Sequence, residues 1–470
     1  MPQSTQNLPS ETFAIPFSPT QGEIVTYTNG HRLVIVPKAG EVFNLNTWVA
    51  TGSIHETEAD NGVSHFLEHL MFKGTTNAAP GEFDHAMESM GAIINAATWK
   101  DFTFYYITGP NADPAAFAKA LEMHADMLTN STLPPEEIGP EYDPADPTYA
   151  GEKRERSVVI EEIGMREDQP MTKLYNAVNK LMYNDGHPYQ RDVIGLRHTI
   201  GTIPRTAIEA YYRRWYSPNQ CVTLVVGEFD REYLIEAVAK AFSFPEPEAL
   251  APALQHYTEP PAPASFLKQH GQPPELPVIV KGDFETTFFM MGYHGPEVSD
   301  LKASIALDII SYTLTEGRAS RLTQTLIEQA KKPNFNALGS GQYTFKLGNV
   351  FFIQGNFTSA NVEASLLEVR KELYDLLNDN PLTAAELARA KKKLKTQFAE
   401  NVETASGLGD LIGESLTVAG DLRPFTDYLP TLASLTLAEV QAVANTYLAL
   451  DKAYTSVLVP TTHDAPLVAA

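Results

Sequence analysis

A run of prolines divides this chain of 470 residues into two halves. Nine prolines fall between Pro245 and Pro277, in a stretch with almost no periodic apolar pattern. Proline fixes its own φ and disfavours helix at the residue before it, so we expect an extended linker over residues 246–277. The chain is also longer than the roughly 250–300 residues at which a single core stops growing. The sequence therefore predicts two domains, at residues 22–245 and 278–460, with tails at 1–21 and 461–470.

The two halves share a pattern of a strand, a turn that contains glycine, and an amphipathic helix. In the first half, an apolar run reaches Gly227 and is followed by a helical pattern over residues 232–242. In the second half, an apolar run reaches Gly355 and is followed by a helical pattern over residues 362–377. The recurrence of one module at comparable places predicts that the two domains are copies of one unit.

The first half mixes strands and helices along its length. Apolar alternation predicts strands and a hairpin, and a period of 3.6 residues predicts helices. The expected strands are residues 32–37, 45–51, 92–98 and 102–108, and the expected helices are residues 63–72, 115–128 and 152–166. Strands that lead into helices, with frequent hairpins, favour an α+β fold. We therefore expect two homologous α/β sandwich domains, each with helices packed on a mixed, mainly antiparallel sheet.

Composition narrows the possible functions. The formal net charge of -23 argues against a nucleic-acid binder, which needs a basic surface to meet phosphates. The single cysteine, Cys221, lies in an apolar run, where a thiol is usually a small apolar filler. The N-terminus lacks the pattern of a signal peptide, and no stretch approaches 18 consecutive apolar residues. We expect a cytoplasmic protein without a membrane span, and a periplasmic or organellar location stays open if a leader has been removed.

The segment with the clearest chemical meaning is His65-Phe66-Leu67-Glu68-His69. On a helix, residues three and four apart share a face, so His65 and His69 would present two imidazoles to one ion, with Glu68 beside them. Two histidines and a carboxylate, with a fourth position open to water, are typical of catalytic zinc sites. The ion lowers the pKa of the water, and a carboxylate takes the proton. This inverted zincin pattern predicts one Zn²⁺ per chain and makes Glu68 the catalytic base.

A third ligand must come from elsewhere in the chain. The predicted helix over residues 152–166 carries Glu155 and Glu162, which lie on one face because they are seven residues apart. Glu161 projects about 100° away from Glu162 and would face solvent. One of the aligned pair would bind zinc, and the other would orient a ligand through a hydrogen bond. The pattern alone leaves open which glutamate does which.

These residues make the sequence resemble the pitrilysin and insulin-degrading-enzyme family of inverted zinc peptidases. The resemblance is strongest to the half-length branch, which includes mitochondrial processing peptidase and its bacterial relatives, and it covers most of the first half. The matching segments are residues 52–54, 62–75, 95–98, 155–162, 186–189, 216–219 and 225–227. Relative to the usual spacing of the family, residues 139–151 look like an insertion, and their Pro, Gly and acidic residues predict a surface loop.

The resemblance implies a role for each of several residues. The third ligand of the family corresponds to Glu162, and Glu155 matches a glutamate that supports the ligands from behind. The resemblance also implies that an edge strand binds the peptide substrate through its backbone, which holds any extended peptide regardless of sequence. That strand corresponds to Asn95, Ala96, Ala97 and Thr98. An edge strand that neighbouring elements protect is the alternative interpretation.

The second half departs from the family in one respect. Relatives that act alone, or that supply the complementary half of the site, carry an Arg and a Tyr seven residues apart, after a helix similar to residues 318–322. The corresponding positions in this chain fall at Ile327 and at Asn334 or Phe335. The resemblance therefore implies the zinc-carrying subunit of a heterodimer, whose homologous partner supplies the Arg and Tyr. A homodimer or a weakly active monomer is the alternative, because symmetric assemblies are the commoner kind.

The predicted function is that of a zinc metalloendopeptidase that cleaves short or unfolded peptides inside a clam-shell chamber. The acidic charge favours basic peptides, through a steering that salt weakens. The main alternative is a non-catalytic assembly or scaffold subunit of the same family. Such subunits usually have a broken zinc motif, whereas His65, Glu68, His69 and Glu162 are all present. A zinc hydrolase of non-peptide amides or esters is a second alternative, and the peptide-pairing strand argues against it.

Overall fold

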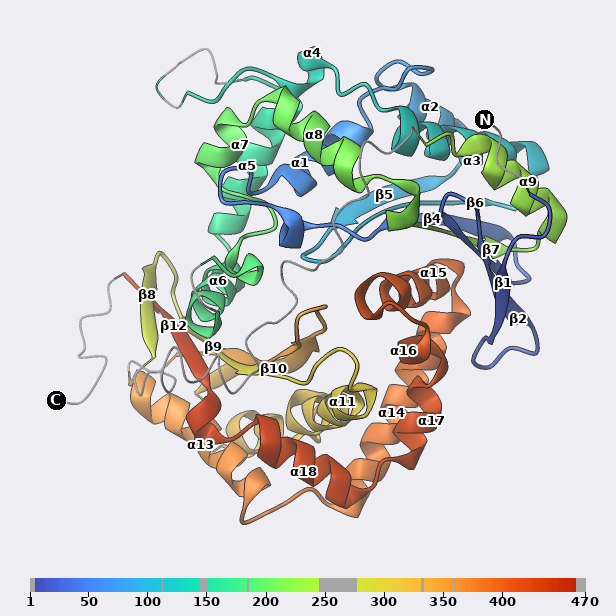
Figure 1. The fold of residues 1–470 in the computed structure, drawn as a ribbon. Coiled ribbons are helices and arrows are strands. Elements are labelled where there is room, and N and C mark those ends of the chain that lie inside the picture. The colour runs from blue at the N-terminus through green and yellow to red at the C-terminus, as the bar shows by residue number, and fades with distance from the viewer. Residues whose placement is uncertain are drawn as a thin grey trace. The chain divides into compact units, whose positions relative to one another are not determined.

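The structure, a computed structural model, describes residues 5–111, 113–143, 145, 151–183, 186–244, 277–330, 334–358 and 361–461. The chain forms two compact units, each a mixed sheet covered by helices (Figure 1), which confirms the predicted α+β class. The first unit consists of Met1–Gly164, Arg191–His256 and Ala399–Thr426, and the second of Met165–Gln190, Tyr257–Phe398 and Asp427–Ala470. The predicted linker over residues 246–277 lies outside the described residues except for residue 277.

In the part of the chain that the structure describes, the first unit contains seven strands and most of the helices of the first half. Its strands are β1 Ser10–Ala14, β2 Gln21–Thr26, β3 Arg32–Pro37, β4 Val42–Val49, β5 Ile93–Thr98, β6 Thr103–Pro110 and β7 Cys221–Gly227. Its helices are η1 Ser53–His55, α1 Val63–Met71, α2 Glu82–Ser89, α3 Pro114–Asn130, α4 Pro135–Ile138, α5 Glu155–Glu167, α7 Arg197–Thr202, α8 Arg205–Trp215, η4 Pro218–Gln220, α9 Arg231–Ala241, α15 Ala405–Glu414, η7 Ser415–Ala419 and α16 Arg423–Thr426. Helix α5 begins in the first unit, and its last residues belong to the second.

Within its described residues, the second unit contains five strands. They are β8 Val278–Gly282, β9 Thr287–His294, β10 Phe335–Tyr343, β11 Val350–Phe357 and β12 Tyr454–Pro460. Its helices are α6 Pro170–Met182, η3 Pro188–Gln190, α11 Leu301–Thr315, α12 Arg321–Thr323, η6 Gln324–Glu328, α13 Val362–Leu377, α14 Ala384–Glu403, α17 Tyr428–Ser434, α18 Leu437–Tyr447 and η8 Leu450–Lys452. Helix α14 begins in the second unit, and its last residues belong to the first.

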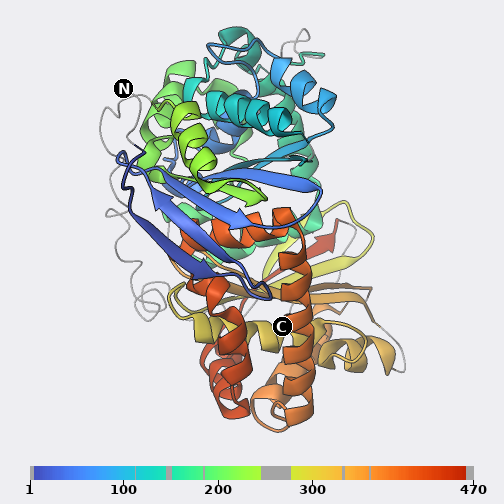
Figure 2. The ribbon, with the colours of Figure 1, turned by 90° about the vertical axis from the view of Figure 1, so that its right-hand side faces the viewer.

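The first sheet has the strand order β1-β2-β3-β7-β4-β6-β5, with β3 and β7 parallel and the other neighbours antiparallel. Helices α1, α3 and α9 pack on one face, and α15 lies against the other (Figures 1 and 2). The central strand β4 is covered on both faces, so all of its residues after Val42 are buried. Strand β5, which contains the predicted peptide-pairing segment, is at the open edge of this sheet.

The second sheet repeats this arrangement with the order β10-β11-β9-β12-β8 and a parallel pair at β8 and β12. By position and direction, β8, β12, β9, β11 and β10 match β3, β7, β4, β6 and β5. The predicted duplication is therefore present, but the two modules compared in the sequence are not equivalent. Strand β7 matches β12, whereas β11 matches β6. The comparison was wrong because a strand followed by a helix occurs more than once in each unit.

Each unit includes a helix from the other half of the sequence. Helix α6 packs on β9 and β12 of the second sheet, and α15 packs on β4 and β7 of the first. Glycine permits both contacts: a Cβ on Gly413 of α15 would lie 2.1 Å from Nε1 of Trp48 in β4. Similarly, a Cβ on Gly292 in β9 would lie 2.5 Å from Val178 of α6. The predicted domain boundaries do not include this exchange, and they stay a prediction. Strand β1 also lies in the segment that was expected to be a tail.

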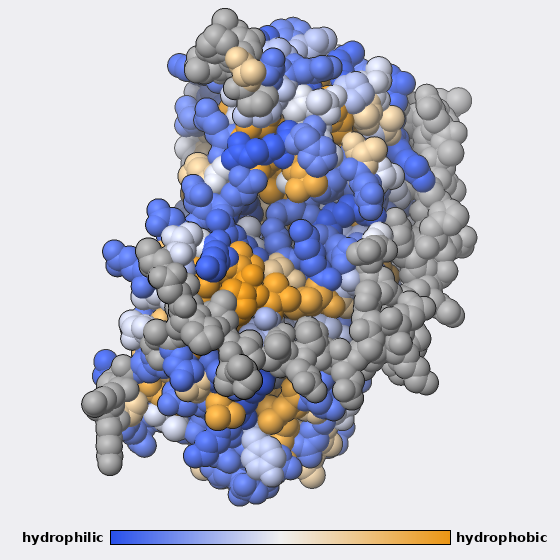
Figure 3. Space-filling model, turned by 90° about the vertical axis from the view of Figure 1, so that its left-hand side faces the viewer, coloured by the Kyte–Doolittle hydropathy of each residue, from blue (hydrophilic) through white to orange (hydrophobic). Residues whose placement is uncertain are grey.

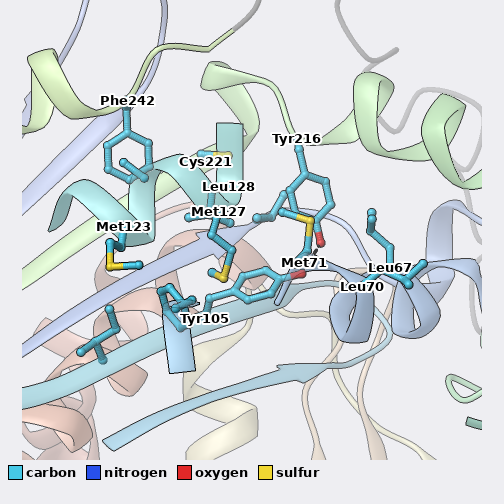
Figure 4. Close-up of a cluster of buried hydrophobic side chains, with 14 of the residues drawn as sticks. Leu67, Leu70, Met71, Tyr105, Met123, Met127, Leu128, Tyr216, Cys221 and Phe242 are labelled. Atoms are coloured by element: carbon cyan, nitrogen blue, oxygen red, sulfur yellow. Dashed lines mark hydrogen bonds between the residues drawn. The ribbon is translucent and has the colours of Figure 1, made fainter. Parts of the chain in front are cut away.

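The core of the first unit is built around α1 and its neighbours (Figure 4). Leu67, Leu70 and Met71 of α1 are buried in the same cluster as Tyr105 of β6. The hydroxyl groups of Tyr105 and Tyr216 are 2.7 Å apart, which satisfies two polar groups inside an apolar core. The remaining labelled side chains of this cluster are Met123, Met127, Leu128, Cys221 and Phe242. This packing holds one side of α1 rigidly in the core.

Hydrophilic residues cover most of the face drawn in Figure 3, and hydrophobic residues gather there in separate patches. Among the described residues, no helix is both long enough and apolar enough to cross a membrane.

Candidate metal and catalytic site

Helix α1 begins at a tightly built corner. Gly62, its N-cap residue, has φ 94°, and a Cβ there would lie 2.6 Å from Cα of Gly195. Only glycine combines this left-handed conformation with so close a contact. The buried carboxylate of Glu56 accepts hydrogen bonds from the backbone N–H groups of Gly62 and Ser64, at 2.8 and 2.9 Å. A negative group at this helix end is favoured by the helix dipole, so Glu56 fixes where α1 starts.

The predicted motif lies on this helix as expected from its spacing. His65, Glu68 and His69 occupy one face of α1, with the rings of His65 and His69 4.8 Å apart between centroids. His65 and Glu68 are 7% and 9% exposed, and the side chain of His69 is 21% exposed. The site is therefore largely desolvated but remains open at His69.

Helix α5 brings Glu162 to the same place. Its Oε2 lies 3.6 Å from Nε2 of His65 and 3.5 Å from Nε2 of His69. One ligand atom from each of these three residues lies within 4.8 Å of the other two. A tetrahedral zinc ion with bonds of about 2.0–2.1 Å would place its ligand atoms about 3.3–3.4 Å apart. Two nitrogens and one carboxylate oxygen at these separations fit zinc in number, chemistry and spacing.

Glu155 lies on the other side of His69. One of its oxygens is 3.0 Å from Nδ1 of His69, and the other is 2.8 Å from Nζ of Lys73. His69 is thus held between two carboxylates, with Nδ1 toward Glu155 and Nε2 toward Glu162. A carboxylate that accepts from Nδ1–H leaves the lone pair on Nε2, which is the nitrogen that faces the cluster.

The charges around His69 shift its protonation. Burial alone lowers the pKa of His69, but Glu155, Glu162 and Glu68 together raise it to about 9. Burial raises the pKa of Glu155, and the hydrogen bonds from His69 and Lys73 outweigh this and hold the pKa below its usual value. The surrounding carboxylates therefore favour a positive charge at this position, as expected for residues that gather around a cation.

Arg156 fixes helix α5 against its surroundings. Its side chain is buried, and its Nη2 donates to the carbonyl oxygen of Ile203 at 2.9 Å. A second donor of the same guanidinium bonds to the carbonyl oxygen of Ile200. The guanidinium also lies 5.5 Å from the ring centroid of Phe66 in α1. This residue ties together the two helices that carry the cluster.

The predicted peptide-pairing segment occupies the edge strand β5. Asn95 is exposed, Ala96 and Ala97 are half-buried, and Thr98 is buried. The side-chain oxygen of Asn95 accepts a hydrogen bond from N–H of Ala96 at 2.9 Å. Thr98 points inward, where its Oγ1 donates to Oε2 of Glu68 at 2.5 Å. An open edge next to Glu68 is suitable for strand addition, and the substrate-binding role of these residues stays a prediction.

The positions expected to correspond to the Arg and Tyr of relatives have structural roles here. Ile327 lies in the π-helical turn η6 and packs against the second core. Asn334 donates to Oγ of Ser365 at 2.7 Å, and Phe335 is buried in the second core at 2% exposure. Ile327 and Phe335 have no polar side-chain atoms, and the side-chain amide of Asn334 is engaged with Ser365.

Two supporting residues were not identified in the sequence. Lys73 follows His69 by four residues, so helical spacing could have suggested its contact with Glu155. Glu56 caps α1 from a position seven residues before Val63, the first residue of the helix, and no periodic pattern marks it. The bond from Thr98 to Glu68 was also missed, although alternation along β5 directs Thr98 inward.

Two sequence families match the chain. Residues 34–187 match Insulinase (Peptidase family M16), and residues 202–394 match Peptidase M16 inactive domain. Zinc protease PqqE of Helicobacter pylori is 30% identical over 431 residues, which span 90% of this chain and 90% of that protein. The uncharacterized zinc protease YmxG of Bacillus subtilis is 26% identical over 423 residues, which span 89% of this chain and 94% of that protein.

Solved structures share the fold along nearly the whole chain. A protease from Helicobacter pylori superposes with a TM-score of 0.77 at 26% identity, covering 93% of this chain and 99% of the other. A structure described as peptidase M16 inactive domain from Pseudomonas fluorescens gives a TM-score of 0.79 at 19% identity, and the match covers 98% of this chain and 100% of the other. The duplicated fold and these relatives define the class of half-length, pitrilysin-type peptidases. The chain belongs to peptidase family M16.

Proposed function

We propose that this protein is a zinc metalloendopeptidase whose ion is held by His65, His69 and Glu162. The convergence of two imidazole nitrogens and one carboxylate oxygen beside Glu68 carries the proposal. The relatives named zinc proteases support the class of reaction and the choice of metal. A bound zinc ion would polarise the scissile carbonyl and acidify the attacking water.

The side chains of the chain supply the other parts of the reaction. Glu68 would take the proton from the attacking water and deliver it to the leaving amine. Glu155 would hold His69 in the tautomer and orientation that a ligand needs. Strand β5 would bind an extended peptide along its open edge through main-chain hydrogen bonds. This binding mode accepts many sequences, so we propose short or unfolded peptides as substrates.

A partner subunit is the second part of the proposal. Ile327, Asn334 and Phe335 occupy the positions where relatives carry the Arg and Tyr that stabilise the oxyanion. A homologous partner that carries this pair would complete the site, and the two chains would enclose the peptide. The net charge of -23 favours basic peptides among the possible substrates.

The test is cleavage of a quenched basic peptide of about 15 residues, long enough to pair with β5 and extend beyond it. The purified protein is compared with and without a chelator, beside Glu68→Gln and the control Glu161→Gln, which changes an exposed glutamate of α5. We expect cleavage to fall about 10²–10⁴-fold in Glu68→Gln, with zinc still bound, and to be unchanged in Glu161→Gln.

Each other outcome has a distinct meaning. One bound zinc per chain without cleavage, with activity restored by a partner that carries Arg and Tyr, would support the heterodimer. Full activity of the isolated chain, at the mass of a monomer in solution, would contradict it. No zinc bound, or cleavage that is unaffected by Glu68→Gln, would overturn the peptidase and favour an assembly subunit.

A further inference from the structure

Thr98 joins the open edge of the first sheet to the proposed general base. It is the last residue of β5, and its side chain points to the face of the sheet on which α1 packs. Its Oγ1 donates to Oε2 of Glu68 at 2.5 Å, and both residues are 9% exposed. A hydrogen bond to a carboxylate in so dry a setting is stronger than one between neutral groups.

The backbone of Thr98 has a separate role, which follows from the register of the hairpin. N–H of Trp99 donates to the carbonyl oxygen of Phe102 at 2.8 Å, so these two residues form a hydrogen-bonded pair. The next pair, Thr98 and Thr103, is then of the non-hydrogen-bonded kind. In such a pair the N–H and C=O groups point away from the partner strand. Because β5 is the edge strand, the main chain of Thr98 faces the open side.

Ala96 provides a check on this register. It is two residues before Thr98, so its main-chain groups should also point to the open edge. Its N–H indeed bonds to the side-chain oxygen of Asn95, at 2.9 Å, rather than to β6. The edge of β5 therefore presents the main-chain groups of alternate residues, the last of which is Thr98.

We infer that Thr98 is a positioning residue that orients Glu68 through its hydroxyl while its main chain pairs with the peptide. The hydroxyl holds one oxygen of Glu68 in place. Peptide binding at the end of β5 and the orientation of the base are thereby coupled through one residue. This inference rests on the proposed function, and it changes the predicted role of Thr98 from peptide binding alone.

The test is a pair of substitutions that separate the hydroxyl from the strand. Thr98→Val keeps the shape and the β-branching but removes the donor, and Thr98→Ser keeps the donor. We expect Thr98→Val to lower kcat about 10–100-fold, which is about 1.4–2.7 kcal/mol, with KM within about twofold of the wild type. Thr98→Ser should recover most of kcat, because the hydroxyl can still reach Glu68.

A matched control lies directly across the hairpin. Thr103 is also a buried threonine, and its Oγ1 donates to the carbonyl oxygen of Thr51 at 3.0 Å. Thr103→Val should lower the unfolding midpoint without lowering kcat. Zinc affinity should be the same in wild type, Thr98→Val and Thr98→Ser, because Thr98 does not contact the three ligand atoms.

Crystal structures of the variants give a readout that does not depend on activity. We expect the Glu68 carboxylate to keep its position in Thr98→Ser and to turn away or take several rotamers in Thr98→Val. Wild-type kcat in Thr98→Val, or a rise in KM that Thr98→Ser does not reverse, would overturn the positioning role while leaving the peptidase intact. A wild-type protein that shows no chelator-sensitive cleavage, either alone or with a partner that carries Arg and Tyr, would overturn the proposed function, and this inference with it.

Discussion

The contact between Glu155 and His69 gives a prediction about metal affinity. Glu155 bonds to Nδ1 of His69 at 3.0 Å and is 7% exposed, so the bond is charge-assisted and largely dry. Such bonds contribute about 1.5–3 kcal/mol, and neutral ones about 0.5–1.5 kcal/mol. Glu155→Gln keeps the hydrogen-bond acceptor and loses the charge, which weakens the bond by about 1.4 kcal/mol. Because this free energy corresponds to a factor of ten in affinity, zinc should bind about tenfold more weakly. Glu155→Ala removes the acceptor, and the loss should approach about 100-fold.

The assay is competition for zinc with a chromophoric chelator of known affinity at neutral pH. Glu161→Gln is the control, since it changes an exposed glutamate on the same helix and should leave the affinity within about twofold. The unfolding midpoint of each metal-free variant separates a loss of affinity from a loss of fold. Affinities of Glu155→Gln and Glu155→Ala equal to that of the wild type would refute the reasoning, because His69 would then need no support at Nδ1.

Three further predictions concern stability. Burial lowers the pKa of His124, which bonds to Thr47, to about 3, so the fold keeps it neutral while the unfolded chain protonates near pH 6.5. The contribution of His124 to the free energy of unfolding is fully present above pH 6.5 and is lost as the pH falls toward 3, by on the order of 5 kcal/mol. In His124→Gln, the denaturant midpoint should therefore fall less steeply than in the wild type as the pH is lowered from 6.5. Burial raises the pKa of Asp308 to about 6 from 3.8, so its contribution is present below pH 3.8 and is lost as the pH rises through 6. The free energy of unfolding of Asp308→Asn should therefore rise relative to that of the wild type between pH 4 and pH 8, by up to about 3 kcal/mol. The same difference between variant and wild type at pH 4 and at pH 8 would contradict this. Gly413→Ala would bring a methyl group 2.1 Å from Nε1 of Trp48, and should cost about 1–3 kcal/mol and change the tryptophan fluorescence of the folded protein.

Local sequence patterns were sufficient to predict the helices and strands near the site. The helix that carries His65 and His69 was expected at residues 63–72 and is observed as Val63–Met71, because its apolar side repeats with a period of 3.6 residues. The hairpin of β5 and β6 likewise follows from alternation and a polar turn. Sequence spacing also placed Glu155 and Glu162 on one face of a helix, and the structure brings both to His69.

What the sequence could not predict depends on contacts between distant segments. Residues 69 and 155 are 86 positions apart, and the choice between two glutamates needed a family resemblance or a structure. Periodicity says which side of a helix is apolar, but not which sheet it covers, so the exchange of α6 and α15 had no sequence signal. The equivalence of β7 with β12 was hidden for the same reason, since strand pairing and not local pattern defines it.

Because α6 and α15 are exchanged, neither half of the sequence corresponds to a complete folded unit. Each compact unit contains chain from both sides of residues 246–277, because Met165–Gln190 belongs to the second unit and Ala399–Thr426 to the first. A protease that nicked the segment between the halves would therefore leave two fragments that remain interlocked, each completing the fold of the other. The reciprocal exchange is the topology of a domain-swapped dimer joined end to end.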